Sequence, residues 1–363
     1  MTSASRLARF ASRRSPVSLL TLAVLALFAV AAAGCGDDGD KGTSKKQAAS
    51  NANSLVIYSG REQKLAKPLF KRFEIDTGID LEVRYAESPE LAATLAEEGD
   101  NSPADVFYAQ DSGSIGSIEG MLAPLPAATL ALVEPRFRDE QGRWTGVTGR
   151  VRVLIYNTEE VKAADLPNSV LDVIDKRFRG KLGIAPTNSS FVAFVSGMRQ
   201  TIGDKRTLAW LEAVKANEPR IYEKNSQIAE AVGEGEVQYG LVNHYYLYER
   251  LEKNPDLPIA NHLFAPGDPG RLVNVSAAGI LTTAKRPKLA QQFIEYLLEE
   301  GQAYIANDAP EREYPLVMGA ANIERAKELP PLDQIKGPDV DLGSLGSELR
   351  STVELIEKSG LGS

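Results

Sequence analysis

The sequence predicts an α/β protein with two lobes joined by a pair of strands. Strand and helix patterns alternate over the first folded segment, at the spacing of a parallel sheet with right-handed crossovers. Two later strand patterns, near 151–157 and 271–280, stand where the chain would pass between the lobes. In such a protein a ligand binds at strand and helix ends in the cleft, and the lobes close by a hinge motion.

The beginning of the 363-residue chain indicates an export signal and a tether. Arginines precede an apolar run at 17–33, which leads through small residues to Cys35. This arrangement resembles the lipobox of bacterial lipoproteins, which implies a signal peptide at 1–34 and a lipid on Cys35. A plain secretory signal or a single membrane anchor is the alternative. Residues 35–53 are polar and predict a flexible tether, so the folded part is expected at the cell membrane, facing the periplasm or the exterior.

The first lobe is expected at 54–153 and 276–325. Apolar residues at spacing four (Leu65, Leu69 and Phe73) predict a helix that buries one face. The expected elements are a strand at 55–58, a helix at 63–76, a strand at 80–85, a helix capped by Ser88 and ending at Gly99, a strand at 103–108 and a helix opening at 110–113.

The second lobe is expected at 154–275 and 326–363. Its elements and the returning segments follow from apolar runs and from turn residues between them. They are strands at 151–157, 181–185, 239–242 and 271–282, and helices at 191–201, 207–216, 226–232 (capped by Ser226), 247–253, 288–300 and 344–358.

Composition excludes several classes of function. The formal net charge is -8, and an acidic balance argues against a nucleic-acid partner. Cys35 is the only cysteine, so no disulfide is expected. The sequence has no G-x-S-x-G, no H-E-x-x-H and no P-loop, and we therefore expect no enzyme.

The strongest candidate for a site is the adjacent pair Tyr245 and Tyr246, which follows the strand at 239–242. Ligands bind at the carboxyl end of such a strand, and two neighbouring tyrosines can present their phenol oxygens to one point. A phenol has a pKa of about 10, so it ionises at neutral pH only beside a strong cation. Ferric iron is a hard trivalent cation that suits tyrosinate oxygen. The alternative for the pair taken alone is ordinary aromatic packing.

Six segments, in order, resemble the bacterial periplasmic ferric-iron-binding proteins, the substrate-binding components of iron ABC transporters. The segments are 57–61, 102–107, 149–154, 185–187, 224–226 and 243–246, and the resemblance covers nearly all of 54–325. It implies a type II periplasmic-binding-protein fold, in which each lobe is a mixed sheet flanked by helices and two strands form the hinge. It also implies a monomer that captures Fe(III) and delivers it to a membrane permease and its ATPase.

The resemblance assigns roles to particular residues. Tyr245 and Tyr246 match the two tyrosinates that bind Fe(III), and phosphate or carbonate serves as a synergistic anion in many members. Residues that match anion-binding positions lie at a helix N-terminus, where backbone N–H groups attract anions, and on nearby turns. These residues are Asn188, Ser189, Ser190, Asn225 and Asn243, with Arg150 in the third segment. Taken alone, the asparagines are turn or cap residues.

Two positions depart from the family pattern. Glu62 stands where some members have a histidine ligand, and its carboxylate is also a hard oxygen ligand; the alternative is an acid in the first turn of a helix. Gln110 stands where members often have glutamate, and a neutral amide is a poor ligand for Fe(III). The site is then expected to be more open, to rely more on the anion, or to use Arg61 to hold a carbonate as some relatives do. His244 and His262 are expected to be structural.

The sequence leaves a second function open on the same scaffold. Relatives of this fold also bind phosphonates, thiamine or polyamines, and the fold alone does not decide among them. The tyrosine pair favours iron, whereas Gln110 favours an organic or phosphorus-containing solute. A tyrosinate protein loaded with iron is coloured and an organic-solute binder is not, so a spectrum separates the two.

Overall fold

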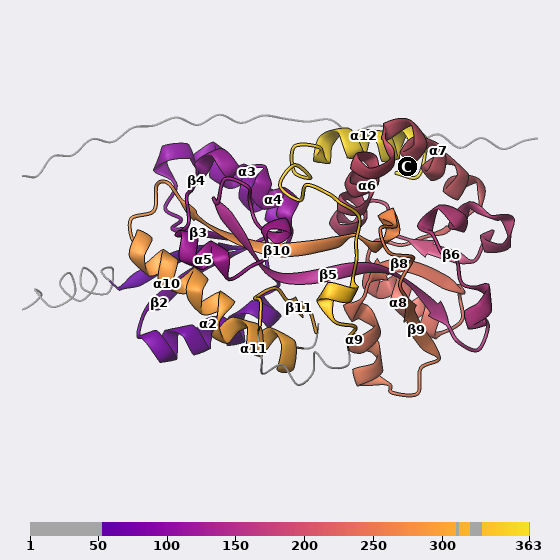
Figure 1. The fold of residues 1–363 in the computed structure, drawn as a ribbon, viewed down its shortest axis with the longest axis horizontal. Helices are drawn as coiled ribbons and strands as arrows, with labels where there is room; N and C mark the ends of the chain where they lie inside the picture. The colour runs from indigo at the N-terminus through magenta and orange to yellow at the C-terminus, as the bar shows by residue number, and fades with distance from the viewer. Residues whose placement is uncertain (1–52, 310–311, 320–328, 363) are drawn as a thin grey trace, which may run out of the picture. The chain divides into compact units, whose positions relative to one another are not determined.

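The computed structural model describes residues 53–309, 312–319 and 329–362 (Figure 1). The expected signal peptide at 1–34, Cys35 and the tether up to residue 52 lie outside the described residues. Within the described ranges, no helix combines the length and the apolarity that crossing a membrane requires.

The first sheet has the strand order β2-β1-β3-β10-β5. Its strands are β1 (Ser54–Ser59), β2 (Asp80–Tyr85), β3 (Val106–Ala109), β10 (Val273–Leu281) and β5 (Trp144–Asn157), with the short β4 (Leu122–Ala123) and β11 (Tyr314–Pro315) at β10 and β5. Strand β1 is parallel to β2 and β3, as the alternating pattern predicts, whereas β10 is antiparallel to β3 and β5. The sheet is therefore mixed.

Strand β5 belongs to both sheets of the molecule. Its first part pairs with β10, and from Arg152 onward it pairs with β8 and β9. The second sheet continues from β5 through β8 (Tyr239–Asn243), β6 (Leu182–Ile184) and β7 (Arg220–Ile221), with β9 (Ile259–His262) also on β5. Figure 1 shows β5 and β10 side by side between the two groups of elements, as expected for a two-strand connection.

The strand predicted at 151–157 begins seven residues earlier, at Trp144. The preceding segment contains Gly146 and Gly149, and glycine is unfavourable in the interior of a strand. In the structure these glycines are needed for close packing. A Cβ on Gly146 would lie 2.6 Å from the carbonyl oxygen of Phe137, and one on Gly149 would lie 2.9 Å from a methyl carbon of Leu316.

Helices cover the sheets. They are α2 (Gln63–Thr77), α3 (Ser88–Glu98), α4 (Ser112–Gly116), α5 (Ala127–Ala131), α6 (Ser189–Ile202), α7 (Asp204–Ala216), α8 (Asn225–Gly233), α9 (Tyr245–Lys253), α10 (Pro287–Leu298), α11 (Glu300–Asn307) and α12 (Leu349–Ser359). The apolar face predicted for α2 is confirmed, since Leu65, Leu69 and Phe73 are buried. Phe73 meets Phe293 of α10 edge to face, with ring centroids 5.1 Å apart.

Two predicted helix caps are wrong. Ser88 lies inside the first turn of α3, where its Oγ accepts a hydrogen bond from the backbone N–H of Gln110 at 2.8 Å. Ser226 lies inside α8, which begins at Asn225. The extended N-cap residue is Glu87 for α3 and Lys224 for α8, so neither serine is the capping residue.

The end of the chain differs from its predicted helix at 344–358. Helix α12 starts only at Leu349, because the segment before it contains Gly343 and Gly346, which approach the glycines of α4 closely. Helix α12 packs against α6, and the Ser196 and Thr352 hydroxyl oxygens lie 2.8 Å apart there.

Candidate metal centre

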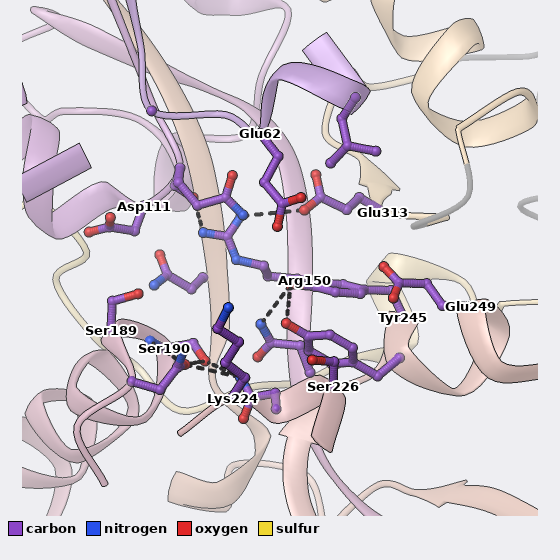
Figure 2. A pocket seen from close by; sticks show the side chains of 18 of the residues that line it. Glu62, Asp111, Arg150, Ser189, Ser190, Lys224, Ser226, Tyr245, Glu249 and Glu313 are labelled. Atoms are coloured by element: carbon purple, nitrogen blue, oxygen red, sulfur yellow. Dashed lines mark hydrogen bonds and ion pairs between the residues drawn. The ribbon is translucent and has the colours of Figure 1, made fainter. Parts of the chain in front are cut away.

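A cavity of about 270 Å³ is lined by residues that belong to both sheets and their helices. Figure 2 shows Glu62 and Glu313 on one side of it, with Ser190, Lys224 and Tyr245 facing them. The predicted site residues that line the cavity are Glu62, Gln110, Arg150, Asn188, Ser189, Ser190, Asn225, Asn243, Tyr245 and Tyr246. Among the residues predicted to bind the metal or the anion, Arg61 is the one that does not line it.

The tyrosine pair occupies the first turn of α9, two residues before the predicted helix start. Strand β8 ends at Asn243, His244 is the N-cap residue, and the two tyrosines follow directly. Their phenol oxygens lie 3.4 Å apart, and their ring centroids are 4.5 Å apart. Asn243 Nδ2 donates to the Tyr245 phenol at 3.4 Å. The end of the strand and the start of the helix thus bring two phenol oxygens to one point on the cavity wall.

Burial keeps both phenols protonated in the absence of a cation. It raises the pKa of Tyr245, although Arg150 opposes this shift. It also raises the pKa of Tyr246, and the neighbouring Tyr245 and Glu249 raise that pKa further. Two buried phenols that cannot easily ionise need a strong cation between them to become ligands.

A second cluster of polar groups lies where α6 and α8 begin. Asn188 is the N-cap residue of α6, and its Oδ1 accepts hydrogen bonds from Ser190 N at 3.1 Å and Ser190 Oγ at 2.7 Å. Asn225 Nδ2 donates to the same Oδ1 at 3.0 Å and to Ser190 Oγ at 2.7 Å. The predicted role of this turn assumed free backbone N–H groups. The backbone N–H of Ser190, however, already donates to Asn188 Oδ1.

Arg61 is held away from the cavity by Glu313. Its Nη2 lies 2.9 Å from Glu313 Oε2, and its Nη1 donates to Glu313 Oε1 at 3.2 Å and to Gln110 Oε1 at 2.7 Å. Arg150 also forms an ion pair with Glu313, at 3.4 Å, and donates to the backbone oxygen of Gln110. Burial raises the pKa of Glu313, but the two arginines outweigh it and bring the pKa to about 2. The expected carbonate-holding guanidinium of Arg61 is therefore already engaged by a buried carboxylate.

Glu62 and Gln110 both line the cavity from the first-sheet side. Glu62 is the N-cap residue of α2 but caps no backbone N–H there. Its side chain is 66% exposed and forms an ion pair with Lys64 Nζ at 3.0 Å. The Glu62 side chain can thus turn toward a bound cation at little cost in free energy. The side-chain oxygen of Gln110, in contrast, already accepts a hydrogen bond from Arg61.

Four carboxylates of the cavity wall were not among the predicted site residues: Glu87, Asp111, Glu249 and Glu313. Glu249 lies four residues after Tyr245 on α9, so helix periodicity would have found it once the helix start was known. The pKa of Glu249 is raised above its ordinary value, mainly by burial. Lys64 opposes this shift and Glu62 adds to it. Glu313 is 252 residues from Arg61, and no local pattern indicates that they meet.

The histidines are not part of the cavity wall. His244 is buried; its Nδ1 accepts from the backbone N–H of Val151 at 3.3 Å, and its Nε2 lies 3.1 Å from the Arg312 carbonyl oxygen. Burial lowers the pKa of His244 to about 4, so the ring is neutral. Nowhere in the described ranges do three or more His, Cys, Asp or Glu side chains gather as a metal cluster.

Comparison with known proteins identifies the family. A model described as "Bacterial extracellular solute-binding protein" matches residues 100–341. The chain belongs to this family. The "Fe(3+)-binding periplasmic protein" of Serratia marcescens is 36% identical to this solute-binding protein over 321 residues, which cover 87% of this chain and 93% of that protein. The "Major ferric iron-binding protein" of Neisseria meningitidis serogroup B is 29% identical over 317 residues, covering 85% and 93%.

Among solved structures, the solute-binding protein is similar to iron-bound HitA from Pseudomonas aeruginosa. The two share 35% sequence identity with a TM-score of 0.77, over 85% of this chain and 99% of that chain. The predicted two-lobed periplasmic-binding-protein fold and the resemblance to ferric-iron-binding proteins are thereby confirmed. The names of these relatives describe binding of a solute rather than catalysis, which agrees with the expectation that this protein is not an enzyme.

Proposed function

We propose that this protein captures ferric iron outside the cytoplasm and delivers it to an ABC permease and its ATPase. One observation carries the proposal: the phenol oxygens of Tyr245 and Tyr246 lie 3.4 Å apart on the wall of a polar cavity. Two oxygens bound at about 2 Å to one ion, at a right angle, lie about 3 Å apart. The pair therefore needs little rearrangement to hold one ion.

A synergistic anion, phosphate or carbonate, completes the coordination in this proposal. The donors for it are the side chains at the starts of α6 and α8, namely Asn188, Ser189, Ser190 and Asn225, with Asn243 and Arg150 beside them. Helix N-termini favour anions, and amide and hydroxyl groups can reorient to bind them. An anion held there adds oxygen ligands that the first lobe, with Gln110 in place of a carboxylate, lacks.

The proposal includes the division into lobes and the membrane tether. The lobes are 54–153 with 276–325, and 154–275 with 326–363, and they close on the loaded cavity by a hinge motion. A lipid on Cys35 and the tether at 35–53 hold the monomeric domain near its permease. Equilibrium dialysis of the metal-free protein against ferric citrate tests the function. One tightly held iron per chain is the expected result, and no retained iron refutes the proposal.

Iron binding is expected to weaken as pH falls. Burial raises the pKa of both phenols, so both hold protons at neutral pH and must release them to iron. Two released protons give a fall of about 100-fold in affinity per pH unit, once the chelator's own titration is subtracted. Competition against citrate at about pH 7.5 and about pH 6.5 measures this change, and the phenols start from their protonated form throughout that interval. An affinity that does not change between the two would contradict tyrosinate coordination.

Glu62 is expected to contribute less than the tyrosines. Because its side chain is 66% exposed, Glu62→Ala should lower iron affinity by about tenfold or less. Glu82→Ala, on an exposed position of β2, is the matched control and should have no effect. Titration of both variants with ferric citrate checks the prediction. A loss through Glu62→Ala as large as that through a tyrosine variant would make Glu62 a principal ligand.

One observation favours the alternative solute. Lys224 and Arg150 also line the cavity, and their ammonium and guanidinium groups donate hydrogen bonds but cannot coordinate a metal ion. These groups suit an oxyanion such as a phosphonate or a phosphate ester. Thermal-shift screening of phosphonates and thiamine esters in the absence of iron tests it. A stabilisation larger than that produced by ferric citrate would favour this alternative over iron.

A further inference from the structure

Arg152 is a buried cation behind the candidate metal centre. It lies on β5 at the point where this strand passes from β10 to β8, and it is 2% exposed. None of the ion pairs found among the described residues includes it, and its Nε has no hydrogen-bond partner there. Arg150, two residues earlier, has the buried carboxylate of Glu313 as a partner.

The contacts of Arg152 lead to the cavity wall. Its Nη1 donates to Ser190 Oγ at 3.2 Å and to Asn225 Oδ1 at 3.5 Å, and its Nη2 donates to the Leu241 carbonyl oxygen at 2.6 Å. Ser190 and Asn225 are hydrogen-bonded to each other, and both line the cavity. One guanidinium therefore orients a side chain at the start of α6 and another at the start of α8.

The charge of Arg152 lacks a counter-charge in the described residues. Taking a guanidinium out of water costs free energy that a nearby anion must offset. The carbonyl, hydroxyl and amide oxygens around Arg152 are neutral, and the rings of Phe191 and Phe194 supply only weak cation–π attraction, with centroids 5.8 and 5.7 Å from its Cζ. Burial lowers the pKa of Arg152 to about 9, and ionised Tyr246 and Tyr245 would raise it.

We propose that Arg152 is a positioning residue for the loaded site: it holds Ser190 and Asn225 toward the anion and supplies the positive charge that two phenolates and the anion require. This inference rests on the proposed function. The free protein carries the buried charge uncompensated, and loading brings the negative charges that compensate it. Arg152 thereby favours the ligand set as a whole, although it does not line the cavity.

A second buried arginine provides a matched control. Arg271 is 8% exposed, its Nε also lacks a partner, and it donates to the carbonyl oxygens of Phe264 and Gln334, both at 3.2 Å. Neither of these two hydrogen bonds reaches a residue that lines the candidate metal centre. Replacing Arg271 removes the same kind of buried group without altering the cavity.

The experiment compares Arg152→Met, Arg152→Lys and Arg271→Met with the unmodified protein. Iron affinity is measured by competition with citrate, with and without phosphate, and each protein's melting temperature is recorded without iron. Arg152→Met should lower iron affinity about 10- to 100-fold, the usual loss when a group that orients metal ligands is removed. It should also reduce the gain in affinity that phosphate provides. Arg152→Lys should recover part of both, and Arg271→Met should leave both unchanged.

Three results would overturn the proposal. The first is a folded Arg152→Met variant that retains full affinity and the full phosphate effect. The second is an equal loss of iron affinity in Arg152→Met and Arg271→Met, which would indicate a purely structural role. Absence of iron binding by the unmodified protein would instead refute the proposed function itself, and the inference with it. The unmodified protein thus separates failure of the inference from failure of the function.

Discussion

Replacing Tyr245 and Tyr246 together with phenylalanine is expected to abolish ferric-iron binding. The two phenol oxygens lie 3.4 Å apart, and each would become a charged oxygen ligand. Phenylalanine keeps the buried rings, so the fold should persist. Each single variant should lose roughly 100-fold in affinity, about 2.7 kcal/mol, and the double variant should lose on the order of 1,000-fold or more. Competition with citrate measures all three.

Tyr248→Phe is the matched control for these variants. Tyr248 lies on the same helix α9, but its ring packs against His244, at a centroid distance of 6.4 Å, and it does not line the cavity. The Tyr248→Phe variant should bind iron with the affinity of the unmodified protein. Near-normal binding by both single variants at Tyr245 and Tyr246 would exclude tyrosinate coordination.

Removal of the Glu313 carboxylate is expected to give the largest loss of stability. Glu313 is 1% exposed and forms ion pairs with Arg61 and Arg150, which are also buried. Glu313→Ala leaves two buried guanidinium groups without this partner, and breaking a buried pair in this way costs about 3–5 kcal/mol. Urea unfolding of the metal-free protein measures the change. The Glu313→Ala variant should also bind iron less tightly. Glu313 holds Arg150 and, through Arg61, is connected to Gln110, and both of these residues line the cavity.

The same ion pairs predict an acid-sensitive stability. The pKa of Glu313 in the folded protein, about 2, lies below its ordinary value of 4.5. A lowered carboxylate pKa means that the stabilisation is complete above pH 4.5 and is lost as pH falls toward 2. Glu313→Ala should therefore be less acid-sensitive than the unmodified protein across this window.

Glu354→Ala provides the control for Glu313. The pair between Arg350 and Glu354 is exposed on α12, and exposed pairs contribute about 0–1 kcal/mol. A change in unfolding free energy for Glu313→Ala that does not exceed this control would contradict the role assigned to the buried cluster.

The order of elements and the tyrosine pair could be predicted from sequence because the information is local. Strand β2 at Asp80–Tyr85 follows from strict alternation, and helix α2 follows from apolar residues at spacing four. Tyr245 and Tyr246 are adjacent, so their proximity needed no knowledge of the fold. The residues predicted on the anion side came from the family resemblance, because taken alone their asparagines indicate only turns or caps.

The remaining features depend on tertiary contacts. The ion pair of Arg61 could not be predicted, because its partner Glu313 lies in a distant segment whose strand β11 pairs with β5. The start of β5 was missed because its glycines serve close packing rather than a turn. Glu249 was missed because the predicted helix began two residues after the true start of α9. Tyr245 was therefore not recognised as lying one helical turn before Glu249. For Arg61 and for β5 the decisive interaction joins parts of the chain that no periodic pattern connects, whereas Glu249 required only the correct helix start.

The most direct test of tyrosinate coordination is the visible absorption spectrum of the metal-free protein, titrated with ferric citrate in the presence of phosphate. Tyrosinate coordination predicts a broad visible band that grows until one iron is bound per chain and that is absent in the double variant of Tyr245 and Tyr246. A folded protein that shows no band at any iron concentration would contradict it. The cavity would then have to serve a different ligand.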